Sequence, residues 1–157
     1  VIDTTAGLGR DGFLLAGSGC RVTLIERHPV VAAVLRDGLT RATAAPSTAE
    51  TSQRTELIED DALTVLASRT ADVVLVDPMY PPRCKSAAVR KEMQLARAVV
   101  GDDEDAAALL ATGLAAARHR VVVKRPRRAE PLPGPAPSTS VEGRSSRFDV
   151  YSRRALP

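Results

Sequence analysis

Val1-Ile-Asp-Thr-Thr-Ala-Gly-Leu-Gly-Arg-Asp-Gly12 is the stretch that decides the fold. Its first two residues are apolar and are typical of the end of a buried strand, and Asp3 stands where that strand would end. A turn with Gly7 and Gly9 follows, and residues 10–16 then have a helix-like pattern. Glycine permits a tight turn and lets a ligand approach the backbone without meeting a Cβ atom. The stretch therefore predicts a strand, a ligand-binding turn and a helix.

Two hypotheses about the ligand follow from this turn. The spacing Gly7-x-Gly9-x-x-Gly12 matches the dinucleotide fingerprint, which indicates an NAD(P)-dependent Rossmann oxidoreductase. That class places a pyrophosphate on the helix N-terminus, but the carboxylates of Asp3 and Asp11 flank the turn and would repel it. They suit a cationic ligand that carries an ammonium and a sulfonium group. The plain alternative is that Asp11 only supports the first helical turn and Asp3 only caps the loop.

Glu26 is the next candidate ligand-binding residue. It ends a predicted second strand at residues 20–26 and lies 23 positions after Asp3. An acidic residue at the end of the second strand of a βαβ unit can accept hydrogen bonds from ribose hydroxyls. Both cofactor hypotheses use this carboxylate, so Glu26 does not separate them, and a simple strand-end charge is the remaining alternative.

The rest of the chain alternates between helix-like and strand-like patterns. This alternation predicts an α/β fold with a mostly parallel sheet and helices on both faces. The last strand follows a loop, so we expect it to run antiparallel. Further strands are expected at residues 57–58, 71–77, 120–124 and 147–151, helices at 29–39, 63–66, 93–100 and 102–117, and loops at 42–53 and 125–143.

Four carboxylates fall near the carboxyl ends of predicted strands: Asp3, Glu26, Asp61 and Asp77. In sheets of this kind ligands bind beyond those ends. Asp61 also precedes a predicted helix, where an acidic residue commonly caps the first turn; contact with an adenine amino group is the alternative role. The convergence of the four residues predicts one cofactor site at this edge of the sheet.

Asp77-Pro78-Met79-Tyr80 is the most informative stretch for the chemistry. Pro78 and the following Pro81-Pro82 pair favour an extended turn at the tip of a buried strand. Such a turn can present a carboxylate and an aromatic ring together. Methyl transfer to an exocyclic amine needs acceptors that orient the amine, and a flat surface on which the base stacks. The alternative is that Asp77 caps a turn and Tyr80 is a packing residue.

Together the two motifs resemble the class I S-adenosylmethionine-dependent methyltransferases, which have a Rossmann-like fold. Asp77-Pro-Met-Tyr80 is similar to their Asp/Asn-Pro-Pro-Tyr/Phe signature, with Met79 in place of the second proline. The order of the motifs resembles the RsmJ family, which methylates a guanine N2 amine in small-subunit (16S) ribosomal RNA. The stretches that carry this resemblance are residues 3–11, 24–31, 77–81, 85–93, 121–126 and 147–151, which together span most of the chain.

The resemblance implies S-adenosylmethionine (SAM) as the cofactor and assigns the site residue by residue. The implied cofactor contacts are Arg10, Asp11, Glu26, Arg27, Asp61, Ala62 and Asp77, and the opening turn adds Asp3, Gly7 and Gly9 as candidates. The implied catalytic residues are Asp77, which orients the amine, with Pro78 and Tyr80. Asp60-Asp61-Ala62 departs from the family, which has a small, hydroxyl-rich stretch there. Residues 1–157 are expected to form one methyltransferase domain that lacks the family's N-terminal region.

Charge and composition suggest the partner. The formal net charge is +3, and from Arg118 to the C-terminus nine Arg and one Lys face two Glu and one Asp. Such a local excess suits RNA, although a solvated basic tail would look the same. A non-catalytic RNA-binding module with a vestigial cofactor pocket is therefore a further hypothesis. Candidate phosphate contacts are Lys85, Arg90, Lys91, Lys124 and Arg125.

Two isolated cysteines, Cys20 and Cys84, have no spacing that indicates a disulfide framework or a metal site. No stretch reads as a signal peptide or a membrane-spanning helix. The sequence therefore predicts a cytoplasmic protein that needs no metal and has no membrane partner.

Overall fold

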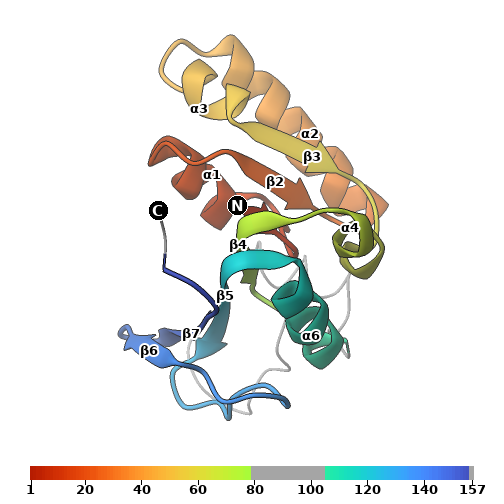
Figure 1. Ribbon diagram of the computed structural model, residues 1–157. Helices are drawn as coiled ribbons and strands as arrows, with labels where there is room; N and C mark the ends of the chain where they lie inside the picture. Colours follow the sequence, from red (N-terminus) through yellow and green to blue (C-terminus); the bar gives the residue numbers. More distant parts are fainter. Residues whose placement is uncertain (79–104, 156–157) are drawn as a thin grey trace.

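The computed structural model describes residues 1–78 and 105–155. Within these ranges, strands from both ends of the chain form one sheet in the order β3-β2-β1-β4-β5-β7-β6 (Figure 1). The strands are β1 (Ile2–Asp3), β2 (Val22–Ile25), β3 (Thr55–Ile58), β4 (Ala71–Val76), β5 (Ala117–Pro126), β6 (Thr139–Glu142) and β7 (Ser146–Ser152). The helices are α1 (Arg10–Gly17), α2 (Pro29–Ala44), α3 (Ala49–Gln53), α4 (Ala62–Ser68) and α6 (Ala106–Ala116).

The sheet is parallel from β3 to β5 and antiparallel beyond it. β1 pairs with both β2 and β4, β2 pairs with β3, and β4 pairs with β5, all in parallel. β7 runs antiparallel to β5, and β6 runs antiparallel to β7. A parallel neighbour needs a long crossover, usually a helix, whereas an antiparallel neighbour can follow a loop. The predicted mostly parallel sheet with an antiparallel C-terminal strand is confirmed.

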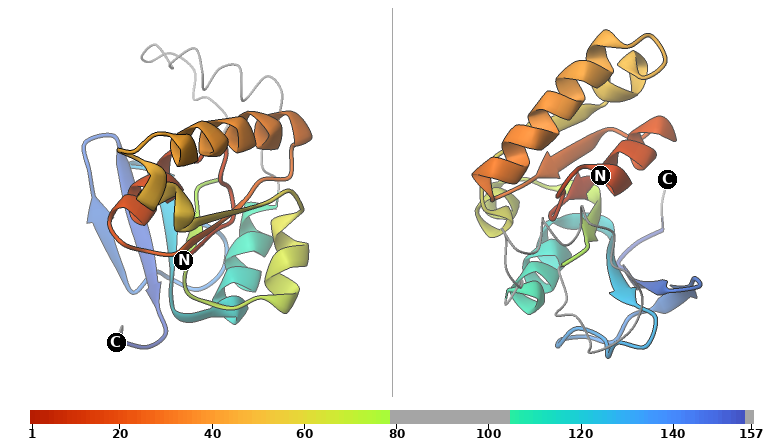
Figure 2. Two further views of the ribbon diagram at one scale, coloured as in Figure 1. Left: turned by 90° about the horizontal axis from the view of Figure 1, so that it is seen from above. Right: turned by 180° about the vertical axis from the view of Figure 1, so that it is seen from behind.

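Helices cover both faces of the sheet, as predicted (Figures 1 and 2). On one face, α4 and α6 pack against a core cluster that contains Val74, Val121 and Leu110. On the other face, α1 and α2 close a smaller cluster around Leu24 and Leu35. β2 contributes to both clusters, Ile25 to the first and Val22 and Leu24 to the second, whereas the buried Val74 and Val76 of β4 belong to the first alone.

The starts of the helices follow from local sequence. Gly9 precedes α1 in the left-handed conformation, with φ of +75°, which costs glycine little. Pro29 is the first residue of α2, where its missing N–H leaves no hydrogen bond unmade. Asp61 caps α4, because its carboxylate accepts hydrogen bonds from the backbone N–H groups of Leu63 and Thr64. The predicted capping role of Asp61 is confirmed.

Two regions that the sequence predicted as loops contain regular structure. Within residues 42–53, α2 continues to Ala44 and α3 follows. There the Ser52 hydroxyl donates to the carbonyl of Leu39, 3.1 Å away, and so fastens α3 to α2. Within residues 125–143, β5 extends to Pro126, and β6 occupies residues 139–142. Composition did not indicate β6, because its exposed strand depends on pairing with β7.

Candidate cofactor and active site

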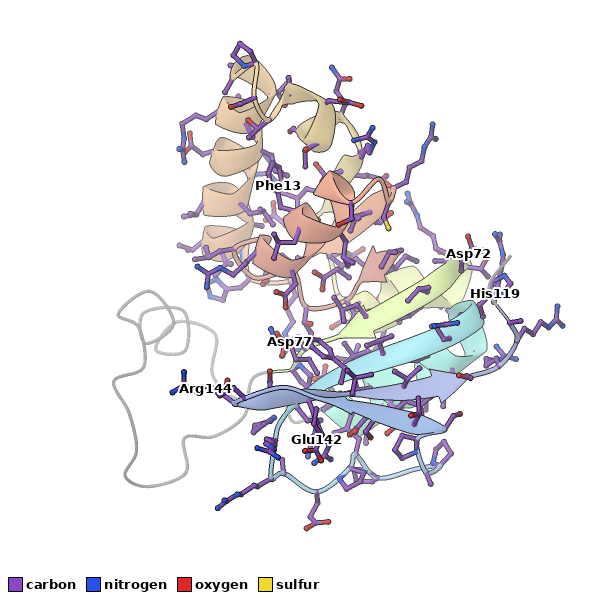
Figure 3. The ribbon with its side chains drawn as sticks, turned by 90° about the vertical axis from the view of Figure 1, so that its left-hand side faces the viewer. Phe13, Asp72, Asp77, His119, Glu142 and Arg144 are labelled. Carbon is purple, nitrogen blue, oxygen red and sulfur yellow. The ribbon has the colours of Figure 1, made fainter. Side chains whose placement is uncertain are left out.

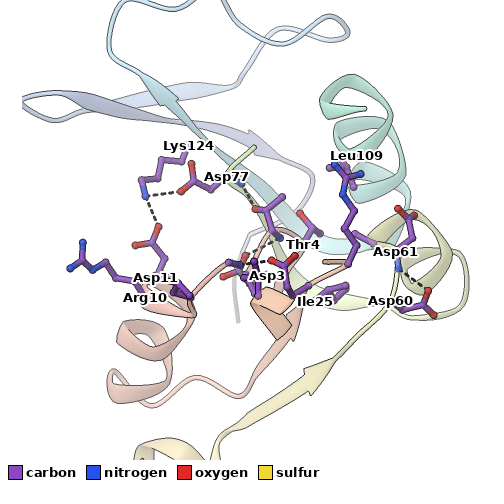
Figure 4. A pocket seen from close by; sticks show the side chains of 18 of the residues that line it. Asp3, Thr4, Arg10, Asp11, Ile25, Asp60, Asp61, Asp77, Leu109 and Lys124 are labelled. Carbon is purple, nitrogen blue, oxygen red and sulfur yellow. Dashed lines mark hydrogen bonds and ion pairs between the residues drawn. The ribbon is translucent and has the colours of Figure 1, made fainter. Parts of the chain in front are cut away.

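A cavity of about 450 Å³ lies at the carboxyl ends of the parallel strands (Figure 4). It opens where β1 lies between β2 and β4, so that the chain leaves β1 toward one side and reaches β4 from the other. Such a switch point is the usual ligand site of an open α/β sheet. The carboxylates that line the cavity are Asp3, Asp11, Glu26, Asp60, Asp61, Asp77 and Asp105, and the cations are Arg10, Arg27 and Lys124.

Glu26 is held in place by the glycine turn. The backbone N–H of Gly7 donates to Oε2 of Glu26 at 2.9 Å, and the N–H of His28 donates to Oε1 at 2.8 Å. Glu26 is 7% exposed. A carboxylate offers about four acceptor positions, so Glu26 can accept hydrogen bonds from a ligand while it keeps both backbone bonds.

The end of β1 is joined to the end of β4. The backbone N–H of Asp77 donates to the Thr5 hydroxyl oxygen at 2.7 Å. The N–H of Thr5 in turn donates to Oδ1 of Asp3 at 3.2 Å. Thr4 adds two further bonds to the carbonyl of Leu75, one from its N–H and one from its hydroxyl. These bonds fix the loop after β1 and the start of the Asp77 turn relative to each other.

Asp3 is the most deeply buried carboxylate of the cavity, with 2% of its surface exposed. Burial raises the pKa of Asp3 to about 7, against the opposing hydrogen bond from the Thr5 N–H. The nearby carboxylates of Asp77 and Asp11 raise it further, because a second negative charge disfavours ionisation. The Asp3 carboxyl group therefore gains its negative charge near neutral pH.

Lys124 lies between two carboxylates. Its Nζ donates to Oδ2 of Asp11 at 2.6 Å and to Oδ2 of Asp77 at 2.8 Å (Figure 4). Burial by itself would lower the pKa of Lys124, but the hydrogen bonds to Asp11 and Asp77 outweigh it and raise the pKa. The ammonium group thus stays charged and links α1, β4 and β5.

The structure brings most of the predicted cofactor residues together. Asp3, Gly7, Arg10, Asp11, Glu26, Arg27, Asp61, Ala62 and Asp77 all line the one cavity. Gly9 shapes the turn beneath it, since a Cβ at this position would lie 2.6 Å from Cδ1 of Leu35. Pro78 is buried beside Asp77. Their contacts with a cofactor or a target base stay predictions.

The candidate RNA contacts are only partly described. Tyr80, Lys85, Arg90 and Lys91 lie outside the described residues. Lys124 lines the cavity instead of standing on an outer surface. Arg125 is 8% exposed and donates to the carbonyl of Glu130. A phosphate contact by either residue stays a prediction.

The structure adds site residues that the sequence did not indicate. Thr5 anchors the Asp77 backbone, Asp105 pairs with Arg27 at 2.8 Å, and Leu109 contributes an apolar wall from α6. Asp105 and Leu109 follow no motif. Thr5 belongs to the opening motif, but its partner lies 72 positions away, and no local pattern carries that information.

The cavity's charge separates the two cofactor hypotheses. Its seven carboxylates outnumber its three cations, which opposes a pyrophosphate and suits a ligand that carries an ammonium and a sulfonium. Its volume lies within the usual range for small-molecule sites. Gly7 and Gly9 adopt positive φ angles in the turn beside the cavity, and neither carries a side chain that would fill the space for a ligand. The residues present therefore fit SAM.

Residues 1–78 and 105–155 contain neither a metal-binding cluster nor a membrane-spanning helix. In these ranges, no group of three or more His, Cys, Asp and Glu side chains has an arrangement that could hold a metal ion. None of the helices described there has both the length and the apolar character needed to cross a membrane.

Known proteins similar to this chain are methyltransferases. "Ribosomal RNA small subunit methyltransferase J" of Pseudomonas aeruginosa is 53% identical over 159 residues, which cover 99% of this chain and 61% of the relative. The protein of the same name from Coxiella burnetii is 56% identical over 153 residues, or 96% and 59% of the two chains. The chain thus spans about three fifths of these relatives' length.

A solved structure supports the fold and the family. The crystal structure of a SAM-dependent methyltransferase from Neisseria gonorrhoeae superimposes with a TM-score of 0.77 at 41% sequence identity, covering 96% of this chain and 63% of that one. The family described as putative SAM-dependent methyltransferases matches residues 1–153. On this match the chain belongs to the SAM-dependent methyltransferase family, and its sheet is that of a class I methyltransferase.

Proposed function

We propose that this chain transfers a methyl group from SAM to the exocyclic N2 amine of a guanine in small-subunit (16S) ribosomal RNA. The observation that carries the proposal is the acidic cavity at the β1–β4 switch point, with Asp77 at its edge. The names of the relatives, which are 53–56% identical, support the ribosomal substrate. The resemblance of the Asp77 turn to the signature of amino methyltransferases supports the amine as acceptor.

The cofactor is proposed to lie across the ends of β1, β2 and β4. Glu26 would accept hydrogen bonds from the ribose hydroxyls, and Asp61 and Ala62 would flank the adenine. Asp3 and Asp11 would attract the cationic end of the molecule. When bound, SAM supplies a methyl group that is already activated by the sulfonium, so the chain itself needs no strong base.

Asp77 is proposed to orient the target amine by accepting a hydrogen bond from it. Its backbone is fixed by Thr5, and its carboxylate is fixed by Lys124. A fixed acceptor contributes to the rate by holding the amine nitrogen in line with the methyl group. Stacking of the base on Tyr80 and phosphate contacts of Lys85, Arg90 and Lys91 complete the proposal. Because its substrate is ribosomal RNA, we propose that the protein works in the cytoplasm and that residues 1–157 form its methyltransferase domain.

Calorimetric titration with SAM, S-adenosylhomocysteine and NADH tests the cofactor. Saturable binding of the first two and none of NADH is expected, with binding weakened at least tenfold in Glu26→Ala. Glu142→Ala is the matched control, since Glu142 is an exposed carboxylate on β6 that lies outside the cavity. No SAM binding by a folded chain, with the Pseudomonas aeruginosa relative binding in parallel, would overturn the proposal.

Methyl transfer to small-subunit RNA tests the reaction. Incorporation of labelled methyl into guanine N2, read by nucleoside analysis, is the expected result. Binding of NADH would favour the oxidoreductase hypothesis. RNA binding without any response to SAM would favour the non-catalytic module. The comparisons with known proteins support neither alternative.

A further inference from the structure

Lys124 lies where three elements of the site meet. It follows the β5 residue Val123, which pairs with Val76 of β4, so Lys124 and Asp77 are neighbours at the carboxyl ends of adjacent parallel strands. Its ammonium donates to Asp77 at 2.8 Å and to Asp11, in the first turn of α1, at 2.6 Å. One side chain therefore joins α1, β4 and β5.

The charges make this arrangement more than a surface ion pair. The side chains of Lys124, Asp11 and Asp77 are 27%, 32% and 34% exposed, so all three are partly withdrawn from water. Both carboxylates lie within hydrogen-bond reach of one ammonium, and without it they would repel each other. The buried Asp3 adds a third acidic group to the neighbourhood. Removing the cation is therefore expected to shift the Asp77 carboxylate away from Asp11.

Asp77 is consequently held both at its backbone and at its carboxylate. Its backbone N–H is bonded to Thr5, and its carboxylate is bonded to Lys124. The Thr5 bond fixes where the residue stands, whereas only a side-chain partner can fix the direction of the carboxylate. This direction decides where a target amine would be placed.

We propose that Lys124 is a positioning residue for methyl transfer, which fixes the Asp77 carboxylate against Asp11, and is not a contact to an RNA phosphate. The proposal rests on the proposed function, since it assigns the side chain that aims the acceptor of the target amine. It predicts an effect on turnover, whereas a phosphate contact would act on RNA affinity and on its salt dependence.

The same two strands supply a matched control. At their opposite ends, Arg118 of β5 pairs with Asp72 of β4 at 3.4 Å, and the two side chains are 61% and 57% exposed. Figure 3 shows Asp72 and Asp77 at opposite ends of the sheet. Arg118→Met removes one positive charge and one β4–β5 ion pair, as Lys124→Met does, but does so far from the cavity.

The first experiment measures steady-state methyl transfer by Lys124→Met, Lys124→Arg and Arg118→Met. Lys124→Met is expected to lower kcat by roughly 10- to 100-fold, with KM for RNA and Kd for SAM within about threefold of the wild-type values. Lys124→Arg, which keeps the cation, is expected to recover part of kcat, and Arg118→Met is expected to retain it. A raised KM for RNA with a shallower salt dependence and an unchanged kcat would overturn the proposal.

The second experiment needs no activity. A double-mutant cycle of Lys124→Met and Asp77→Asn, followed by chemical unfolding, is expected to be non-additive by about threefold or more in the unfolding constant. The cycle of Arg118→Met with Asp77→Asn is expected to be additive. Additive effects in the first cycle would overturn the positioning role even in an active enzyme. If the first cycle shows coupling but the wild-type protein neither binds SAM nor transfers methyl, the proposed function is refuted. The catalytic part of this inference is then refuted with it.

Discussion

The hydroxyl oxygen of Thr5 accepts a hydrogen bond from the backbone N–H of Asp77 at 2.7 Å, across 72 positions of sequence. This bond connects the two motifs that the sequence shows separately, the glycine turn after β1 and the Asp77 turn after β4. It makes the position of the candidate catalytic carboxylate depend on the glycine turn. The first prediction below tests this dependence, and the second tests the carboxylate itself.

Replacing Thr5 by Val should misplace Asp77. Val has the same shape but no acceptor, so a partly buried N–H would lose its partner, at a cost of about 1–3 kcal/mol in stability. We expect kcat to fall roughly tenfold. Thr5→Ser keeps the oxygen and is the control. Denaturant unfolding and methyl-transfer kinetics of both variants make the comparison, and equal values for Val and Ser would count against the role of the hydroxyl.

Replacing Asp77 by Ala should abolish methyl transfer while most of the affinity for SAM remains. The expected reason is that the target amine loses its acceptor, whereas Glu26 and the glycine turn still bind the cofactor. Asp72→Ala, an exposed carboxylate at the other end of β4, is the control. Calorimetry and a transfer assay report the two properties separately. Turnover close to wild type in Asp77→Ala would refute the assigned role.

Asp3→Asn should change how stability depends on pH. Because burial raises the folded-state pKa of Asp3 to about 7 from 3.8, the folded protein binds this proton more tightly than the unfolded chain. The associated stability is fully present below about pH 4 and is lost as the pH rises to about 7. The variant should therefore gain on the wild type by roughly 3 kcal/mol between pH 5 and pH 8. Denaturant unfolding at both pH values tests this, and a pH-independent difference would contradict it.

Gly12→Ala and Gly38→Ala should have opposite effects. A Cβ on Gly12 would lie 2.2 Å from Cδ2 of buried Leu24, so overpacking should cost about 1–3 kcal/mol. Gly38 lies within α2, where the nearest atom to a Cβ is the Arg41 guanidinium at 4.0 Å. Alanine there should stabilise by about 0.5–1 kcal/mol through helix propensity. Thermal unfolding measures both, and a neutral Gly12→Ala would show that Leu24 can move aside.

Asp149→Ala should destabilise the C-terminal hairpin. Asp149 is 1% exposed and binds the Arg147 guanidinium through both oxygens, at 2.8 and 3.0 Å. Removing one partner of a buried pair costs about 3–5 kcal/mol. The control Asp37→Ala breaks an exposed pair with Arg41 and should cost at most about 0.5 kcal/mol. Chemical unfolding at pH 7 measures both variants, and similar losses would contradict the argument.

The Arg147–Asp149 pair also predicts how the stability of the folded protein changes at acid pH. Burial would raise the pKa of Asp149, but hydrogen bonds from Arg147 and Ser140 outweigh it and lower the pKa. The stability that Asp149 contributes is thus present above its ordinary pKa and is lost as the pH falls through the lower folded-state value. The difference between wild type and Asp149→Ala should shrink below about pH 4.

Local patterns predicted the parallel part of the sheet well. The apolar run at residues 71–77 became β4, and the glycine turn became the start of α1. Local patterns were less informative where an element depends on contacts with another element. The strand β6 has only exposed residues, and α3 is fastened to α2 through Ser52. Neither leaves a hydrophobic period in its own sequence.

The sequence by itself determined the class of fold, the family and most of the carboxylates that line the cavity. Strand ends in a parallel sheet must meet at one edge, so Asp3, Glu26 and Asp77 could be grouped without coordinates. Only the tertiary structure decided which of these groups are paired. It joined Lys124 to Asp11 across 113 positions and to Asp77 across 47 positions. Hydrogen bonds and ion pairs depend on distance in space, and that distance is set by the packing of α1, β4 and β5 rather than by spacing along the chain.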